Sequence, residues 1–222
     1  MDRSESRRIG IFGGTFNPIH NGHLRVAEEV RQTFALQKLF LVPSSRPPHK
    51  GDNEVAAAAH RLAMVRRAQR GNPFFGCSAY ECSKGGTSYS AETLAYFAQR
   101  FAGAELYFVI GWDAWCDIAT WYAFTSLFSL ANFIVISRLG AEPWLAGSEG
   151  KLFPFALKDE FCYEKDSSYR HISGNSLYFL SVTRLDISSS QIRREAAANR
   201  SLRYLVPDGV ARYIFSNGLY LA

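Results

Sequence analysis

The sequence is poor in charge and has no concentrated run of either sign. Charged residues make up 20% of its 222 residues, against 47% hydrophobic and 14% aromatic residues. This balance excludes disordered, collagen-like and coiled-coil chains. A chain of this length and composition can bury the core of one large α/β domain. We therefore expect a single domain over residues 1–222, with a C-terminal helical part from about residue 187.

Metal-binding and membrane signals are also missing. The four cysteines form no CxxC pair and no His-plus-Cys cluster at zinc spacing, so we expect reduced thiols and no metal held by the protein: Cys77, Cys82, Cys116 and Cys162. The polar start, MDRSESRR, lacks the apolar core of a signal peptide, and no apolar stretch is long enough to span a membrane. These absences predict a cytoplasmic protein without a membrane partner.

The basic excess is modest. Lys and Arg number 25 against 20 acidic residues, a net charge of +5, which suits a ligand that carries phosphate. Nucleic acid would suit the same charge. However, the basic residues are dispersed in pairs such as Arg66/Arg67 and Arg193/Arg194, without the dense block of a nucleic-acid arm. We expect no nucleic-acid partner.

Short apolar runs alternate with helical patterns along the chain. The runs lack a polar alternation and therefore fit strands buried on both faces: 9–12, 39–42, 106–110, 133–136 and 177–182. Apolar spacing predicts helices over about 24–34, 62–68 and 91–98, the last with Ser90 as a candidate N-cap. This order predicts an α/β protein with a doubly wound, Rossmann-like parallel sheet.

Two further features complete the outline of the chain. Ser188–Ser190 precede a helix that runs to about Asn199, and Pro207 opens another that stops at Asn217–Gly218. The stretch from about 140 to 175 combines prolines, glycines and mixed charge, and we expect an irregular insertion there.

The segment from Gly13 to His23 is the most informative one. It connects the first predicted strand to the first predicted helix, at the strand end where parallel sheets bind ligands. Glycines 13 and 14 permit a tight turn, and the helix start offers N–H groups to an anion. His20 and His23 are three residues apart and can point at the same phosphate. The alternatives are a turn with two incidental surface histidines, or a metal site that lacks its other ligands.

The glycine pattern argues against two common classes of nucleotide-binding protein. It is not GxGxxG and carries no Walker lysine, which argues against a dinucleotide dehydrogenase and a P-loop NTPase. Near the other end of the chain, Ser188–Ser190 would supply hydroxyls and helix amides beside Arg193, whose guanidinium could hold two phosphates. Taken alone, this segment is better interpreted as an ordinary serine N-cap followed by a solvated arginine.

Together the two segments carry a family resemblance. Gly13–His23 resembles the GGTFDPxHxGH signature of the HxGH-motif nucleotidyltransferases, and Ile187–Arg193 resembles their second signature, ISxTxxR. Intermediate segments are similar to one bacterial branch of that superfamily, the nicotinate-nucleotide adenylyltransferases: Val42–Lys50, Thr87–Leu94, Ile110–Asp113 and Thr120–Tyr122. The resemblance covers the chain except about 140–175.

The resemblance implies transfer of the adenylyl group from Mg²⁺-ATP to nicotinate mononucleotide, as a step of NAD biosynthesis. It implies that His20, His23 and Arg193 are catalytic and that ATP contacts Gly13, Gly14, Thr15, Phe16, His20, His23, Gly111, Asp113, Ser188, Ser190 and Arg193. It implies that the acceptor contacts Lys50, Ser90, Trp121 and Tyr122. For Lys50 an exposed loop, and for Tyr122 a core position, remain open alternatives.

The chemistry of these residues agrees with that implication. An ionised acceptor phosphate can attack the α-phosphorus of ATP in line, so the protein needs to supply only positioning and charge stabilisation. We expect the histidines to stabilise charge and not to act as bases, since a nucleotide phosphate is largely ionised at neutral pH. Nicotinamide mononucleotide or phosphopantetheine as the acceptor, and a catalytically silent nucleotide-binding regulator, are the rival hypotheses.

The sequence also departs from the family pattern. Asn17 replaces the usual aspartate of GGTFDP, which removes a negative charge but keeps a group that can cap a turn. Ser190 replaces the usual threonine of the second signature and keeps its hydroxyl. Trp112 is bulky for a residue between Gly111 and Asp113, and it could reshape an adenine pocket.

Overall fold

The computed structural model describes residues 7–46, 55–138, 152–157, 159–165 and 168–221. The chain folds into two compact units. Unit 1 consists of Met1–Phe12, Ala35–Gln37 and Tyr89–Thr183, and unit 2 consists of Gly13–Phe34, Lys38–Ser88 and Arg184–Ala222. The chain therefore passes between the units several times.

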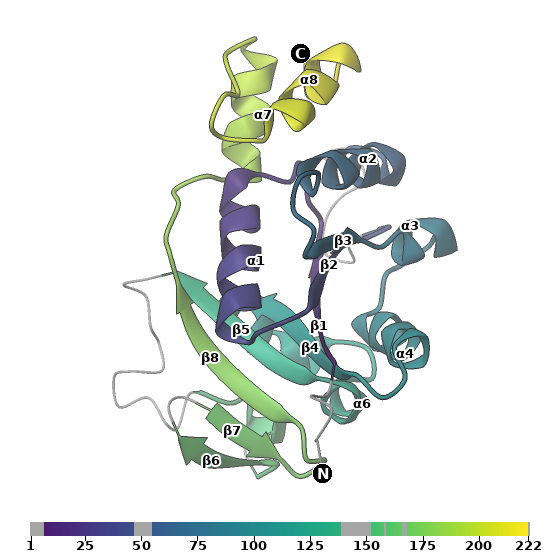
Figure 1. The fold of residues 1–222 in the computed structure, drawn as a ribbon, viewed down its shortest axis with the longest axis vertical. Helices are drawn as coiled ribbons and strands as arrows, with labels where there is room; N and C mark the ends of the chain where they lie inside the picture. The colour runs from purple at the N-terminus through teal and green to yellow at the C-terminus, as the bar shows by residue number, and fades with distance from the viewer. Residues whose placement is uncertain (1–6, 47–54, 139–151, 158, 166–167, 222) are drawn as a thin grey trace. The chain divides into compact units, whose positions relative to one another are not determined.

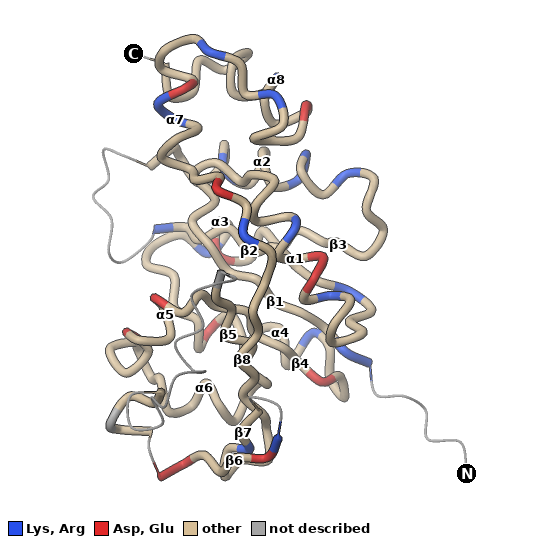
Figure 2. Tube along the Cα trace, turned by 90° about the vertical axis from the view of Figure 1, so that its left-hand side faces the viewer, with Lys and Arg blue, Asp and Glu red and all other residues tan. Residues whose placement is uncertain are grey.

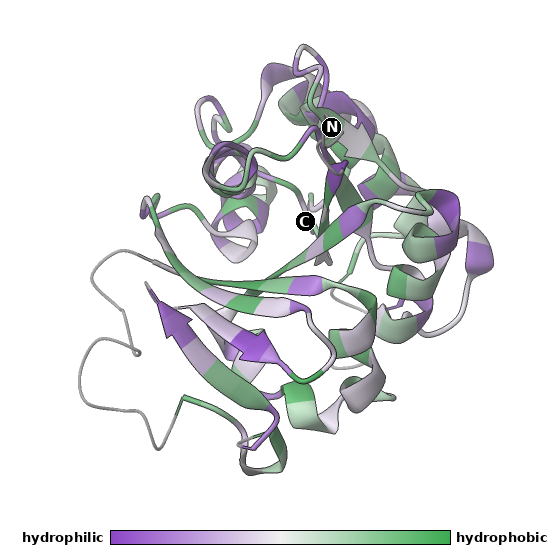
Figure 3. Ribbon diagram, turned by 60° about the horizontal axis from the view of Figure 1, so that its bottom comes forward, coloured by the Kyte–Doolittle hydropathy of each residue, from purple (hydrophilic) through white to green (hydrophobic). Residues whose placement is uncertain are grey.

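Unit 1 is built on a mostly parallel sheet. Its strands follow the order β1-β4-β5-β8-β7-β6, and parallel pairing joins β1 (Arg8–Gly14, in unit 1 through Phe12), β4 (Glu105–Gly111), β5 (Asn132–Arg138) and β8 (Ser176–Val182). The apolar runs that predicted these strands supply the core, since Ile11, Val109, Ile134 and Leu177 are fully buried. Figure 3 shows mainly apolar residues along these strands. The predicted α/β class with a parallel sheet is confirmed.

The prediction of an irregular insertion over about 140–175 is wrong for part of that stretch. Residues 140–151 lie outside the described part, but β6 (Phe161–Lys165) and β7 (Ser168–His171) form an antiparallel pair, and β7 also pairs with β8 (Figure 1). Figure 2 shows acidic and basic residues on these two strands, and Arg170 Nε lies 2.8 Å from Glu164 Oε1. Strand β6 is the edge strand and β7 is its neighbour; both are short and carry polar residues, so neither has an apolar run for a sequence pattern to detect.

Apart from α4, which the sequence predicted, the helices of unit 1 are short. They are α4 (Ser90–Arg100), α5 (Trp112–Cys116) and α6 (Phe124–Leu130), with 3₁₀ turns η2 (Ile118–Thr120) and η4 (Phe155–Leu157). The prediction that Ser90 is the N-cap of α4 is wrong by one residue. Tyr89 has the extended backbone of the cap position, and Ser90 is the first residue of the helix. No side chain caps this helix.

Unit 2 contains the remaining helices and a parallel strand pair. The pair is β2 (Lys38–Pro43) with β3 (Phe75–Cys77), and the helices are α1 (Asn21–Thr33), α2 (Ala58–Ala68), α3 (Tyr80–Lys84), α7 (Ser189–Ala197) and α8 (Asp208–Ser216). Helices α1, α2, α7 and α8 match the predicted segments. The hydroxyl of Tyr213 in α8 lies 3.0 Å from Nδ1 of His60 in α2, within hydrogen-bond distance. The guanidinium of Arg67 lies over the Tyr213 ring, 4.0 Å from its centroid. Helix α8 is thereby fastened to α2.

None of the helices in the described part of the chain is long and apolar enough to cross a membrane.

Candidate active site

The first signature forms a tightly constrained loop in unit 2. After Gly14 the backbone of Phe16 takes a left-handed conformation with φ of 47°, and Asn17 is joined to Pro18 by a cis peptide bond. Phe16 is 2% exposed, and its ring meets the His23 ring edge-on, with 5.1 Å between the centroids. Thr15 lies between Gly14 and Phe16 in sequence and offers its carbonyl to Arg61 at 2.9 Å. The loop therefore presents its backbone while its aromatic side chain is buried.

His20 and His23 cap α1 in a reciprocal arrangement. His23 N donates to His20 Nδ1 at 3.4 Å, and His20 N donates to His23 Nδ1 at 3.3 Å. The two rings stack with 3.7 Å between their centroids. Because each Nδ1 accepts from a main-chain N–H, the proton of each neutral ring lies on Nε2. The pair therefore places two Nε2–H groups at the same helix start, and such donors can stabilise a phosphoryl oxygen.

Gly22 makes this stacked pair possible. A Cβ at this position would lie 3.0 Å from His20 Nδ1 and 3.1 Å from its Cε1. Contacts this short are tighter than most real Cβ contacts, so a side chain here would push the His20 ring aside by a few tenths of an ångström. The glycine of the HxGH pattern is thus needed for close approach.

The second signature meets the first inside unit 2. Ser188 caps α7 by accepting from Gln191 N at 3.1 Å, and Ser189 Oγ donates to Pro18 O at 2.9 Å. Arg193 Nη1 donates to Asn17 O at 2.9 Å across 176 residues of sequence, and its Nη2 lies 3.3 Å from Ser190 Oγ. The start of α7, with Arg193 and Ser190, is therefore held against the loop that leads to His20.

Asn17 joins the loop to two other parts of unit 2. Its Oδ1 accepts from Ala56 N at 3.0 Å and from the hydroxyl of Tyr220 at 2.7 Å, and the residue is 4% exposed. Burial raises the pKa of Tyr220 well above its ordinary value, which keeps this hydroxyl a donor. An amide oxygen serves both donors without the negative charge that the family pattern carries at this position.

Lys50 lies outside the described residues, as does the neighbouring His49.

A second set of predicted residues lies in unit 1, at the end of β4. Gly111 is the N-cap of α5, and a Cβ on it would overlap Asp113 Oδ1, so the carboxylate turns back over the strand end. Trp112 tilts against Phe179, with 6.0 Å between the ring centroids. An exposed carboxylate at the carboxyl end of a parallel strand is placed to accept hydrogen bonds from a ribose or a base.

The predicted acceptor residues of unit 1 lie among aromatic rings. Trp121 contacts Phe108 edge-on at 6.4 Å, and Tyr122 lies 4.7 Å from Tyr89, measured between centroids. Tyr122 is 62% exposed, so its ring is not part of the core. Tyr89 immediately precedes Ser90, and the pairing of the two tyrosines therefore brings Tyr122 to the start of α4. Tyr89 was not among the predicted residues, although the Thr87–Leu94 segment contains it.

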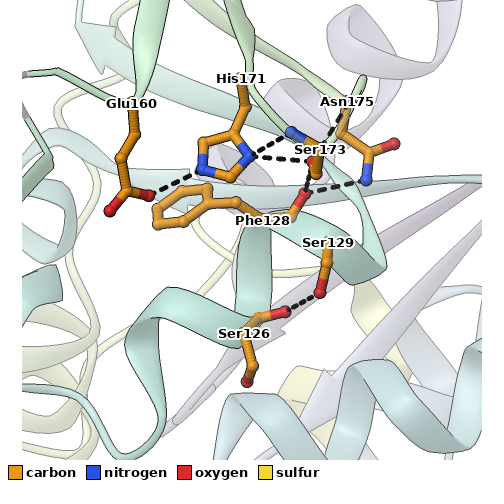
Figure 4. Close-up of polar contacts among 7 residues, drawn as sticks. All are labelled: Ser126, Phe128, Ser129, Glu160, His171, Ser173 and Asn175. Carbon is orange, nitrogen blue, oxygen red and sulfur yellow. Dashed lines mark hydrogen bonds and ion pairs between the residues drawn. The ribbon is translucent and has the colours of Figure 1, made fainter.

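Unit 1 also contains a Glu–His–Ser series that resembles catalytic machinery (Figure 4). His171 Nε2 lies 2.9 Å from Glu160 Oε2, and its Nδ1 lies 2.9 Å from Ser173 Oγ. However, Ser173 N also donates to Nδ1 at 3.1 Å, and Ser173 Oγ donates to the carbonyl of Phe128 at 2.7 Å. The serine proton is directed at a main-chain carbonyl, so these contacts fasten the turn after β7 to α6.

Sequence reasoning missed several residues that build the loop of unit 2. Tyr220 lies 203 residues from Asn17, and Arg61 bonds to carbonyls of three separate segments, so no local pattern indicates their contacts. Gly22 was part of the recognised signature, but its role becomes visible only beside the His20 ring.

Comparison with known proteins places this chain in a family. Residues 11–195 match the model of the cytidylyltransferase-like family. Two relatives named probable nicotinate-nucleotide adenylyltransferase come from Geotalea daltonii, 44% identical, and Geobacter sulfurreducens, 42% identical; each alignment covers 96% of this chain and 98% of the relative. A structure of Plasmodium falciparum nicotinic acid mononucleotide adenylyltransferase complexed with NaAD is similar in fold, with a TM-score of 0.70 and 19% identity over 96% of this chain and 97% of that one.

Proposed function

The chain belongs to the nicotinate-nucleotide adenylyltransferases of the cytidylyltransferase-like family, and we propose that it transfers the adenylyl group of ATP to nicotinate mononucleotide. The products are deamido-NAD and pyrophosphate, and the reaction is a step of NAD biosynthesis. The observation that carries the proposal is the contact of Arg193 with Asn17 O, which joins the two signatures beside the stacked histidines.

The proposed mechanism uses no covalent intermediate on the protein. A phosphate oxygen of the acceptor attacks the α-phosphorus of ATP, the new P–O bond forms, and the bond to the leaving pyrophosphate breaks. The Nε2–H groups of His20 and His23 stabilise the charge that develops on the α-phosphoryl oxygens. Arg193 holds the β- and γ-phosphates with its guanidinium, supported by Ser188, Ser190 and the amides at the start of α7.

The backbone of Gly13, Gly14, Thr15 and Phe16 is proposed to approach the ATP phosphates closely. Mg²⁺ enters with ATP as the Mg–ATP complex and is held mainly by phosphate oxygens. Among the described residues, no group of three or more His, Cys, Asp or Glu side chains is placed to hold a metal ion.

Unit 1 is proposed to supply the groups for the sugar, base and pyridine ring. Gly111 and Asp113 bind the adenosine part of ATP, and Trp121 and Tyr122 stack on the pyridine ring of the acceptor. Ser90 and the main-chain N–H groups at the start of α4 donate to the pyridine carboxylate. We propose Lys50 as a further acceptor contact on the family resemblance alone.

The proposed donors to the pyridine carboxylate, Ser90 and the main-chain N–H groups at the start of α4, are called the carboxylate pocket. They predict which acceptor the enzyme prefers. A carboxylate gains charge-assisted bonds from these donors, whereas an amide must turn its NH₂ toward them or lose one bond. One lost bond to a charged group corresponds to about a tenfold to hundredfold lower kcat/KM. Nicotinate mononucleotide should therefore be preferred over nicotinamide mononucleotide by at least about tenfold.

The test is pyrophosphate release from Mg–ATP with nicotinate mononucleotide, nicotinamide mononucleotide and phosphopantetheine in separate reactions. Equal kcat/KM for the two pyridine nucleotides would refute the carboxylate pocket and keep the enzyme class. Activity with phosphopantetheine alone would overturn the proposed acceptor. ATP binding without release from any acceptor would favour a nucleotide-binding regulator. Trp121→Ala should lower the use of both pyridine nucleotides and keep the preference for the acid, because either ring can stack.

A further inference from the structure

Arg61 is a buried cation of unit 2 that contacts the Gly13–His23 loop through Thr15. It lies on α2 and is 1% exposed. Its guanidinium donates to four main-chain carbonyls: Nε to Ala56 O at 2.8 Å, Nη1 to Thr15 O at 2.9 Å and Ser44 O at 2.6 Å, and Nη2 to Ser45 O at 2.6 Å. Arginine is suited to this task because its planar fork presents several donors in fixed directions.

The four carbonyls belong to three separate segments. Thr15 lies in the loop between the glycines and His20, Ser44 and Ser45 follow β2, and Ala56 precedes α2. These segments are also bonded to one another, since Ser44 N donates to Gly14 O at 3.0 Å and Ala56 N donates to Asn17 Oδ1 at 3.0 Å. The Arg61 side chain therefore sets the spacing between the signature loop and the residues that follow β2.

One of the four bonds of Arg61, that to Thr15 O, brings its charge to the loop, and the Glu81 carboxylate also interacts electrostatically with Arg61. Within the described ranges no carboxylate forms an ion pair with it, and its donors are used by carbonyl oxygens. Burial lowers the pKa of Arg61 from its ordinary value, but arginine starts so far above neutral pH that it stays charged. A positive charge that contacts the backbone of Thr15 favours an anion on the other side of that backbone, and burial limits its screening by salt.

We propose that Arg61 is a positioning residue for the ATP phosphates. It acts through the loop without touching the nucleotide, by fixing the backbone around Thr15 against the exit of β2 and by contributing a buried positive charge. The inference rests on the proposed function, since it assigns the phosphates of ATP to this loop.

Two substitutions separate geometry from charge. Arg61→Lys keeps the charge but cannot reach all four carbonyls, and Arg61→Met removes both. The matched control is Arg67→Lys on the same helix, because Arg67 stacks on Tyr213 and donates only to Ala63 O among the bonds described. Each variant is measured for folded fraction, ATP binding by calorimetry, and kcat and KM for both substrates.

For Arg61→Lys, we expect the Kd and KM for ATP to rise at least about fivefold and kcat per folded molecule to fall about tenfold, with the acceptor KM changing less than about twofold. Arg61→Met should bind ATP more weakly still, and Arg67→Lys should match the parent. If Arg61→Met folds poorly, Arg61→Ala with millimolar guanidinium replaces it, and guanidinium should restore ATP binding where methylammonium does not.

Two outcomes would overturn the inference. One is wild-type ATP affinity and kcat in folded Arg61→Lys; the other is an equal rise of KM for ATP and acceptor, which indicates a general loss of structure. If the parent binds ATP but releases no pyrophosphate with any acceptor, the proposed function fails. In that case weaker ATP binding by Arg61→Lys still supports the positioning role.

Discussion

The hydroxyl of Tyr220 lies 2.7 Å from Oδ1 of Asn17, across 203 residues of sequence. The bond joins the C-terminal segment to the signature loop, next to the carbonyl that Arg193 uses. The C-terminal segment is therefore part of the support of the candidate active site.

Tyr220→Phe removes only this hydroxyl. We expect a loss of about 1 kcal/mol of unfolding free energy and a several-fold lower kcat/KM for ATP, because Asn17 loses one of its two donors. Urea unfolding and steady-state kinetics measure the two effects. Asn17→Asp is the companion variant: it keeps both acceptor bonds and should retain more activity than Asn17→Ala. If Asn17→Ala equals the parent in both assays, the support role is refuted.

Gly22→Ala should disturb the stacked histidines. The added methyl group would lie about 3 Å from the His20 ring, so the ring must move and one Nε2–H donor is misplaced. We expect kcat to fall about tenfold or more, with the helical circular dichroism unchanged. Gly209→Ala is the control, because its methyl group would meet only Arg67 Cβ at an ordinary 3.7 Å. Equal kcat for the two variants would contradict the role of Gly22.

His23→Ala should remove a donor to the transition state while the fold persists. By analogy with a lost oxyanion donor, kcat should drop about a hundredfold or more, and His20→Ala should behave similarly. His60→Ala serves as the control, since that ring bonds Tyr213 of α8 and both residues lie outside the two signatures. A folded His23→Ala variant within about threefold of the parent would remove His23 from the mechanism.

Arg193→Ala should weaken ATP more than the acceptor, because its proposed partners are the β- and γ-phosphates. The comparison is with Arg194→Ala, an exposed neighbour on the same helix. Calorimetry with ATP and with nicotinate mononucleotide gives the two affinities. Unchanged ATP affinity in Arg193→Ala would exclude its contact with the phosphates.

The cysteines should differ in reactivity. Burial raises the pKa of the Cys77 thiol to about 11, so its thiolate fraction near pH 8 is about a hundredfold smaller than that of an ordinary cysteine. Cys116 and Cys162 are exposed. Maleimide labelling of the folded protein, followed by mass spectrometry, should modify these two before Cys77, with Cys77 reacting faster as the pH rises toward 11. Labelling of Cys77 at about pH 8 as early as that of Cys116 and Cys162 would contradict its raised pKa.

Local patterns determined much of this protein. Apolar runs such as 106–110 marked the buried parallel strands, since a strand covered on both faces must be apolar throughout. Ser188 and Pro207 marked the starts of α7 and α8, because capping and a fixed φ depend on the residues at that point. The Gly13–His23 and Ile187–Arg193 segments indicated the family, and through it the expected chemistry.

Tertiary structure decided the features that depend on distant partners. Strands β6 and β7 form at a sheet edge where polar residues are tolerated, so their pairing leaves no periodic signal. Arg61 is buried although arginine is usually exposed, because carbonyls from three segments converge on it. Likewise Tyr220, Asn17 and Arg193 meet only when distant parts of the chain fold together, since a hydrogen bond across about 200 residues is set by the path of the backbone and not by neighbouring residues.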